Sequence, residues 1–193
     1  MDWSSFLAAG QGRPVRELLP AALAYRGERT PGVAVDLGCG DGTESRFLIA
    51  NGWRVHAFDG AAGVEGRAAA GLSPRAAERL SARCVPFEEL EELPENDFVY
   101  AGRSLPFCAE ASFPALWAAI TASLKPGGWF AGDFFGPHDS WVGREDMNFR
   151  DADQIRGLLE GFEVAGLQES EGPAGTPFGP KYLHLVTVVA QRR

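Results

Sequence analysis

Three glycines and two aspartates are concentrated in one short turn of the chain, Asp36-Leu37-Gly38-Cys39-Gly40-Asp41-Gly42. The turn follows an apolar run, 33–37, that predicts a buried strand, and it precedes a segment with helical periodicity that starts at residue 43. Glycines at such a place permit a tight turn, and a ligand can approach the backbone because no Cβ stands in the way. The turn is therefore a candidate ligand-binding loop.

The spacing of the glycines separates two classes of ligand. A pyrophosphate-binding turn reads G-x-G-x-x-G, whereas here the third glycine, Gly42, comes one residue early and Thr43 occupies the expected place. The carboxylates of Asp36 and Asp41 would repel a phosphate and attract a cation. The turn thus favours a cationic ligand such as S-adenosylmethionine, which carries a sulfonium and an ammonium group.

The run Val35–Gly42 resembles the first motif of class I S-adenosylmethionine-dependent methyltransferases, in which this loop supports the methionine part of the cofactor. The segments "GRPVREL", "SLPFC", "FPALWAAI" and "GGWFAGDFFGPHDSW" are similar to small bacterial methyltransferases of the tellurite-resistance type. The resemblance implies an enzyme that uses S-adenosylmethionine to methylate a small-molecule acceptor by in-line transfer. It also implies that the N-terminal segment folds over the cofactor.

The resemblance assigns cofactor contacts residue by residue. Asp59, at the end of the second predicted strand, matches the carboxylate that accepts hydrogen bonds from both ribose hydroxyls. Phe87 and Glu88 match the position that packs on adenine and bonds to it, although Glu88 also lies in an acidic run typical of a solvated helix face. Arg13, or alternatively Arg16, suits the carboxylate of the cofactor, because a guanidinium forks onto carboxylates. The predicted cofactor-binding residues are Arg13, Asp36, Gly38, Cys39, Gly40, Asp59, Gly60, Phe87, Glu88 and Ala101.

Candidates for the acceptor site come from the carboxyl ends of the fourth and fifth predicted strands and from the N-terminal segment. His138, in "FFGPHDSW", is predicted as a catalytic base because the pKa of a histidine suits a base near neutral pH; the alternative is a surface-loop histidine. Tyr100, near the end of the fourth strand, is the second predicted catalytic residue. The other candidates are Trp3, Ser104, Phe107, Asp133, Phe135 and Trp141.

These residues need a frame that brings strand ends together. Strands are predicted at Val33–Leu37, Arg54–Phe58, Arg83–Phe87, Asp97–Ala101, Trp129–Phe135, Phe162–Glu169 and His184–Gln191. Helices are predicted at 43–51, 61–81, 112–124 and Asp151–Leu159, and a Gly/Pro-rich loop at 172–180. Strands that alternate with helices specify a parallel sheet covered on both faces, and ligands bind beyond the carboxyl ends of its strands.

The predicted fold is therefore a single α/β domain over residues 1–193, Rossmann-like and doubly wound. Its seven-stranded sheet is mostly parallel and ends in an antiparallel C-terminal hairpin. Residues 1–32 are predicted to form an N-terminal helical lid, and residues 33–193 the Rossmann-like core.

The composition of the chain limits the classes of partner that it can bind. The chain of 193 residues carries a formal net charge of −8 with no offsetting run of Lys or Arg, so nucleic acid is disfavoured as a partner. The sequence also lacks the "[DNS]-P-P-[YF]" and Pro-Cys motifs of methyltransferases that act on nucleic acid bases.

No metal site is predicted, because the three cysteines lack C-x-x-C spacing and Asp133 has no neighbouring carboxylate. No basic leader or long apolar run is present, which predicts a cytoplasmic protein without membrane contact, as a monomer or homodimer.

Two other functions share this fold. A catalytically silent S-adenosylmethionine-binding protein, acting as a partner or sensor, would carry the same loop and would bind the cofactor without turnover. An NAD-type oxidoreductase would carry G-x-G-x-x-G, and the placement of Gly42 and Thr43 speaks against it. The motifs do not distinguish methylation of nitrogen, oxygen, sulfur, carbon or a metalloid.

Overall fold

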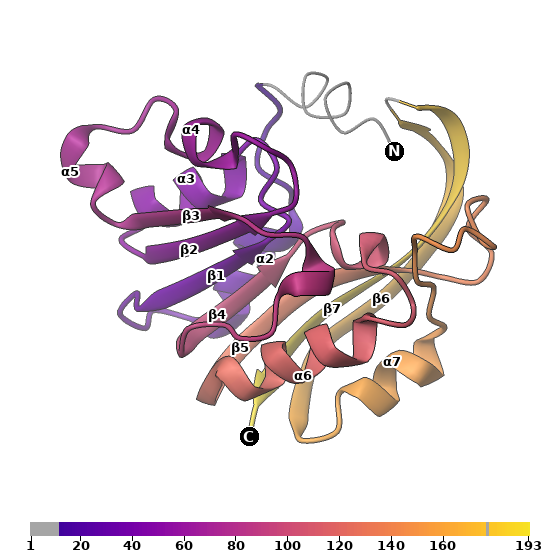
Figure 1. The fold of residues 1–193 in the computed structure, drawn as a ribbon. Coiled ribbons are helices and arrows are strands. Elements are labelled where there is room, and N and C mark those ends of the chain that lie inside the picture. The colour runs from indigo at the N-terminus through magenta and orange to yellow at the C-terminus, as the bar shows by residue number, and fades with distance from the viewer. Residues whose placement is uncertain (1–11, 177) are drawn as a thin grey trace.

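The computed structural model of the protein describes residues 12–176 and 178–193. A seven-stranded sheet with the strand order β3-β2-β1-β4-β5-β7-β6 forms its centre (Figure 1). Strands β1 to β5 are parallel, and β7 pairs antiparallel with both β5 and β6. The strands are β1 (Val33–Leu37), β2 (Arg54–Asp59), β3 (Leu80–Cys84), β4 (Asn96–Ala101), β5 (Leu124–Phe135), β6 (Phe162–Thr176) and β7 (Gly179–Arg192). The predicted doubly wound sheet with its antiparallel hairpin is confirmed.

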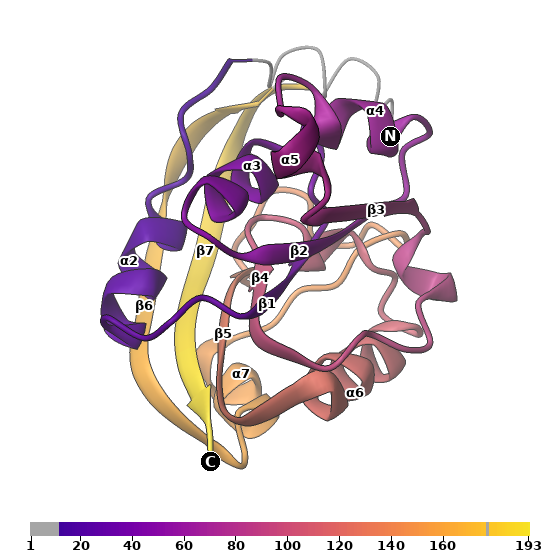
Figure 2. The same ribbon diagram turned by 90° about the vertical axis from the view of Figure 1, so that its left-hand side faces the viewer.

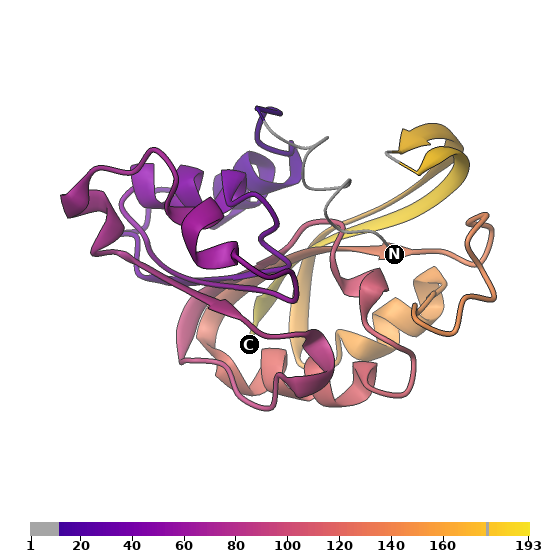
Figure 3. The same ribbon diagram turned by 45° about the horizontal axis from the view of Figure 1, so that its top comes forward.

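Helices cover both faces of this sheet, as the views in Figure 2 and Figure 3 show. They are α2 (Leu18–Arg26), α3 (Thr43–Ala50), α4 (Val64–Ala69), α5 (Pro74–Ala77), α6 (Phe113–Ser123) and α7 (Ala152–Leu158). Buried side chains of α2, α3 and α4 pack on one face, and those of α6 and α7 pack on the other. None of the helices in the described part of the chain is long and apolar enough to cross a membrane.

Alternation along the central strands divides the core in two. In β4, Val99 and Ala101 pack toward α6 and α7, whereas Phe98 and Tyr100 pack toward α2 and α3. The strands are buried on both faces, as expected for a parallel sheet between two helical layers. Helix α2 contacts β5 and β7 and thus belongs to one of these layers. Residues 1–11, including the predicted acceptor candidate Trp3, lie outside the described residues.

Two predicted elements on the β3 side of the sheet differ in the structure. The third strand spans Leu80–Cys84 and not Arg83–Phe87, so Phe87 lies in a short 3-10 turn, η1 (Phe87–Glu89). The helix predicted at 61–81 is wrong in extent, because the chain forms the two short helices α4 and α5 with Gly71 between them in the left-handed region. Strand β3 lies at the edge of the sheet and is largely exposed, so it carries little of the apolar pattern that marks the central strands.

The C-terminal hairpin is longer than its composition indicates. Strands β6 and β7 pair from Phe162–Arg192 to Thr176–Gly179, with one register shift between Val164 and Gly166. The end of the hairpin curves beyond the sheet (Figure 1). The loop predicted at 172–180 is therefore mostly strand. Gly and Pro weaken a central strand, but an edge strand such as β6 tolerates them because half of its backbone groups face away from any partner.

Two glycines with nearly equal φ angles offer a test of the packing between α3 and α4. Gly42 (φ +76°) begins α3, and a Cβ there would lie 2.4 Å from the Cα of Ala68 in α4. Gly71 (φ +78°) has open space at the same position. We predict that Gly71→Ala lowers the free energy of unfolding by about 1–2 kcal/mol through backbone strain alone. Gly42→Ala should lower it by a further 1–3 kcal/mol, roughly, because α3 and α4 must separate.

Urea denaturation of the two variants measures this difference directly. Equal losses would show that the close approach of α3 and α4 contributes nothing to stability.

Candidate active site

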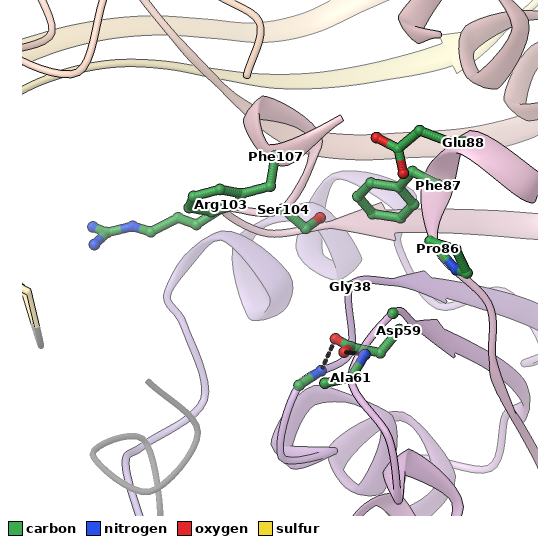
Figure 4. A pocket seen from close by; sticks show the side chains of 11 residues that line it. Gly38, Asp59, Ala61, Pro86, Phe87, Glu88, Arg103, Ser104 and Phe107 are labelled. Carbon is green, nitrogen blue, oxygen red and sulfur yellow. Dashed lines mark hydrogen bonds between the residues drawn. The ribbon is translucent and has the colours of Figure 1, made fainter. Parts of the chain in front are cut away.

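A cavity of about 220 Å³ lies at the carboxyl ends of β1, β2 and β4 (Figure 4). This is the edge at which doubly wound sheets bind their ligands. The lining residues are Gly38, Gly40, Asp59, Gly60, Ala61, Pro86, Phe87, Glu88, Arg103, Ser104 and Phe107. The structure therefore brings together Gly38, Gly40, Asp59, Gly60, Phe87 and Glu88 from the predicted cofactor-binding set. We call this the larger cavity.

Asp59 connects the ends of β1 and β2 within the larger cavity. Its Oδ2 accepts a hydrogen bond from the backbone N–H of Gly40 at 2.8 Å, and its Oδ1 accepts one from Ala61 at 2.8 Å (Figure 4). Each oxygen of a carboxylate has two acceptor sites, so both retain capacity for a further donor. The carboxylate can therefore hold the glycine loop in place and accept two hydroxyl groups at the same time.

Backbone contacts fix the rest of the glycine loop. The N–H groups of Gly38 and Cys39 both donate to the carbonyl of Phe58, at 2.8 and 3.1 Å. Gly38 has a φ of +69°, and a Cβ there would lie 2.3 Å from the Cβ of Ser104. Ser104 in turn donates from its hydroxyl to the carbonyl of Leu37 at 2.6 Å. Only glycine fits at residue 38, because the exits of β1 and β4 lie so close together.

A smaller cavity, of about 50 Å³, continues from the larger one. The two cavities share Gly38, Gly40 and Arg103. The smaller cavity is lined in addition by Arg13, Arg16, Asp36, Cys39, Asp41, Glu44, Tyr100 and Gly102. Four predicted residues, Arg13, Asp36, Cys39 and Tyr100, thus lie here, whereas the predicted residue Ala101 is fully buried and lines neither cavity.

Glu44 decides which arginine is available in the smaller cavity. Both terminal nitrogens of Arg13 lie 2.5 Å from the oxygens of Glu44, which is buried, so the guanidinium of Arg13 already has a carboxylate partner. Glu44 also accepts the backbone N–H of Arg16 at 3.1 Å. The side chain of Arg16 makes no hydrogen bond or ion pair within 12–176 and 178–193, and burial lowers its pKa. Of the two predicted alternatives, Arg16 and not Arg13 therefore presents a guanidinium without a carboxylate partner among the described residues.

Two further groups in the smaller cavity have unusual surroundings. The hydroxyl of Tyr100 is buried and has no hydrogen-bond partner among the described residues, and burial raises the pKa of Tyr100. At neutral pH this phenol is a hydrogen-bond donor and not a proton acceptor. Asp36 is 1% exposed and accepts a hydrogen bond from Ser45 at 2.6 Å; burial raises its pKa to about 7.

Arg103 lines both cavities, yet the sequence patterns gave it no role. Its φ of 54° makes it the one non-glycine residue with positive φ in the described part of the chain. The backbone N–H of Arg103 donates to Oδ2 of Asp133 at 3.0 Å, and Oδ1 of Asp133 accepts from Thr187 at 2.7 Å. Strained backbone of this kind is concentrated at functional sites. The one signal in the sequence is a basic residue directly after Gly102 at the exit of a central strand.

Several predicted acceptor candidates form an aromatic group beside the larger cavity. The ring of Phe107, which lines that cavity, lies 6.0 Å from the ring of Phe135 and 6.2 Å from that of Trp141. Lys181 lies 3.5 Å from the centre of the Trp141 ring and 2.7 Å from Asp139. The face of the Trp141 ring is thus already covered by the ammonium group of Lys181.

His138 lies elsewhere, on an exposed loop, and lines neither cavity. Its Nδ1 lies 3.1 Å from Glu171, and its backbone N–H donates to Nδ1 of His184 at 3.1 Å. His138, Glu171 and His184 form the one group of potential metal ligands found within the described ranges. Because Nδ1 of His184 accepts a hydrogen bond, its proton lies on Nε2, which is 2.6 Å from Glu169. Neither ring nitrogen of His184 has a free lone pair, so this donor set is poorly suited to a metal ion.

Residues 34–128 match the sequence model of a family described as a methyltransferase domain. The chain carries a methyltransferase domain. The predicted methyltransferase activity class is thereby confirmed. No curated protein sequence matches this methyltransferase.

Solved structures share the fold of this methyltransferase at low sequence identity. TehB from Haemophilus influenzae superposes with a TM-score of 0.76 at 14% identity, over 99% of this chain and 67% of TehB. The N-methyltransferase NodS from Bradyrhizobium japonicum, in complex with S-adenosylhomocysteine, gives 0.72 at 15% identity, over 98% of this chain and 96% of NodS. A Burkholderia thailandensis 1,6-didemethyltoxoflavin-N1-methyltransferase gives 0.67 at 22% identity, over 98% of this chain and 84% of that one.

The carboxylate of Asp59 is the first residue to test. We predict that Asp59→Ala weakens binding of S-adenosylhomocysteine by about 1.5–3 kcal/mol, because charge-assisted hydrogen bonds to the loop and to the ligand are lost together. Asp59→Asn, which keeps one acceptor oxygen, should lose less. Calorimetric titration measures both, with Glu78→Ala as an exposed control that removes the same charge. Wild-type affinity in Asp59→Ala would exclude this carboxylate from the ligand site.

Asp36 should make stability depend on pH. Because its pKa is raised to about 7, the folded protein keeps this proton at pH values where the unfolded chain has lost it. Stability therefore falls as the pH rises from about 4 to 7, and Asp36→Asn removes this loss. We expect the variant to gain stability relative to wild type by on the order of 2–4 kcal/mol more at about pH 8 than at about pH 4. Urea denaturation at both pH values would show a constant difference if Asp36 were ionised throughout.

Proposed function

We propose that this methyltransferase transfers the methyl group of S-adenosylmethionine to a small molecule by in-line displacement. The observation that carries the proposal is the pair of connected cavities at the strand ends. A hydrogen-bonded carboxylate, Asp59, lies in the larger cavity, and an unpaired arginine, Arg16, lies in the smaller one. A cofactor with a ribose at its centre and an amino acid at one end fits this arrangement of charges.

The larger cavity fits the adenosine part. The oxygens of Asp59 have acceptor capacity left for the two ribose hydroxyls, and Phe87 offers an apolar ring for adenine. Gly38 and Gly40 leave the backbone accessible, since neither carries a Cβ.

The smaller cavity fits the amino-acid part. Arg16 and the hydroxyl of Tyr100 are donors without partners among the described residues, and a carboxylate would satisfy both. Asp36 lies in the same cavity, and a nearby ammonium group would favour its ionised form. Tyr100 is thus proposed as a ligand-orienting residue, and His138 takes no part in this scheme because it lines neither cavity.

When bound, S-adenosylmethionine supplies an activated methyl group, so that sulfur leaves with the bonding electron pair as the nucleophilic atom of the acceptor takes the methyl. The work left to the protein is alignment and exclusion of water. The fixed loop at Gly38–Gly40 and the wall of buried Ser104 and half-buried Phe107 supply rigid boundaries for that purpose.

A small acceptor is supported by the acidic charge of the chain and by the acceptor of a methyltransferase with the same fold. A formal net charge of −8 disfavours nucleic acid. The toxoflavin-precursor enzyme, whose structure holds 1,6-didemethyltoxoflavin with S-adenosylhomocysteine, is a small-molecule methyltransferase of this fold. The cysteines Cys39, Cys84 and Cys108 are all free thiols, which agrees with a reducing compartment such as the cytoplasm.

The assignment of Arg16 can be tested with two ligands that differ only in the amino-acid part. S-Adenosylhomocysteine carries the carboxylate, and 5′-methylthioadenosine lacks it. We expect Arg16→Gln to weaken binding of S-adenosylhomocysteine about tenfold or more while leaving 5′-methylthioadenosine unchanged, because only the former reaches the guanidinium. Arg75→Gln, an exposed arginine outside both cavities, is the matched control.

Calorimetry of the wild type with NAD completes the test. An equal loss for both ligands in Arg16→Gln would remove Arg16 from the carboxylate site. Binding of NAD in preference to S-adenosylhomocysteine would overturn the proposed function. Tight binding of S-adenosylmethionine with no turnover across a broad acceptor panel would favour a silent binding protein.

A further inference from the structure

A third cavity, of about 710 Å³, adjoins the smaller one and shares only Arg103 with the lining of the larger one. It shares Arg13, Arg16 and Arg103 with the smaller cavity and is bounded by residues 13–25, the exit of β5 and the hairpin β6–β7. We call it the hairpin cleft. Its volume is in the range that holds a drug-sized organic molecule.

The hairpin cleft is lined by both apolar and polar side chains. One wall is apolar and is formed by Val15, Leu18, Ala21, Leu167, Leu185 and Val189. The polar lining residues are Arg13, Arg16, Glu17, Arg103, Asp133, Gln168 and Thr187, and the three arginines among them also line the smaller cavity and so mark the end nearest the cofactor site. A ligand that fills the hairpin cleft therefore has an apolar body and a polar group at the end nearest the cofactor site.

The lining includes the carboxylates of Glu17 and Asp133 as well as three arginines, and two of these arginines are already accounted for. Arg13 is neutralised by Glu44, and Arg16 faces the smaller cavity, which leaves Arg103. The side chain of Arg103 has no hydrogen bond or ion pair to any residue of 12–176 or 178–193, and Figure 4 shows it turned away from Phe87 and Asp59. The guanidinium therefore points out of the adenosine site.

Asp133 limits the kind of anion that can bind beside Arg103. Both of its oxygens accept hydrogen bonds, from the N–H of Arg103 and from Thr187, and Asp133 is 4% exposed. This contact holds Arg103 in its left-handed backbone conformation. A carboxylate nearby disfavours a doubly charged phosphate more than a singly charged carboxylate. One planar guanidinium fork also matches one planar carboxylate.

We propose that the hairpin cleft binds the methyl acceptor, and that the acceptor is an amphipathic organic carboxylate. Its carboxylate pairs with Arg103, and its apolar body lies along Leu18, Leu167 and Leu185. This proposal rests on the proposed function, because Arg16 is taken to bind the cofactor. Asp133 is a positioning residue for Arg103, and no contact of the described structure makes it a catalytic one.

Three probes with the same phenyl group and four-carbon chain but different charge test the proposal. They are 4-phenylbutyrate, its neutral amide and 4-phenylbutylamine, each titrated onto the full chain saturated with S-adenosylhomocysteine. We expect the acid to bind about tenfold or more tightly than the amide and the amine not to bind at millimolar concentration. Arg103→Gln should reduce the acid to the affinity of the amide. Leu185→Ala should weaken the acid and the amide by a similar factor.

Arg75→Gln again serves as the control for loss of one positive charge. Equal binding of acid and amide, a preference that survives in Arg103→Gln, or no binding of the acid would each overturn the proposal. Tighter binding of 3-phenylpropyl phosphate than of the acid would overturn the choice of a carboxylate. If S-adenosylhomocysteine itself failed to bind the wild type, the proposed function would fail first, so the two failures are distinguishable.

Discussion

The carboxylate of Asp59 holds together the two strand ends on which the rest of the site depends. Its hydrogen bonds to the N–H groups of Gly40 and Ala61 join the loop after β1 to the turn after β2. Buried strands alone fix where these loops start, but they leave the direction of each loop open. A charged acceptor bonded to two backbone donors removes that freedom. The larger cavity is therefore formed before any ligand enters, so ligand binding does not bear the entropic cost of ordering the loop.

A second constraint acts through Glu44. This buried carboxylate binds the guanidinium of Arg13 and the backbone of Arg16, and it thereby fixes the segment that precedes α2 against the start of α3. Arg13 therefore has a structural role, whereas Arg16 faces the smaller cavity. Arg103, held by Asp133 on the opposite side, faces the hairpin cleft. The positive charges near the strand ends are thus distributed over distinct positions, which suits two ligands bound side by side.

Much of the frame could be predicted from the sequence because its signals are local. The run Val33–Leu37 is β1 as predicted, and Asp151 begins α7 with a capping box to Gln154. The edge elements escaped prediction for the opposite reason. Strand β3 is exposed and carries little apolar pattern, and the Gly/Pro-rich part of β6 is strand only because β7 pairs with it.

The candidate site shows the same division. The glycine loop and Asp59 could be found because their type and spacing carry the chemistry, and the structure places them in one cavity. The choice between Arg13 and Arg16 depends on Glu44, which no spacing rule connects to them across 28 or more residues. Arg103 depends on a backbone conformation, and the hairpin cleft depends on how far β6 and β7 extend. Such features follow from tertiary packing and not from any single segment.

A crystal structure of the protein with S-adenosylhomocysteine tests the central claim most directly. The account predicts both ribose hydroxyls within hydrogen-bonding distance of the Asp59 carboxylate, the adenine beside Phe87, and the carboxylate of the ligand beside Arg16 with the hairpin cleft still open. A ligand bound elsewhere, or one whose ribose makes no contact with Asp59, would contradict it.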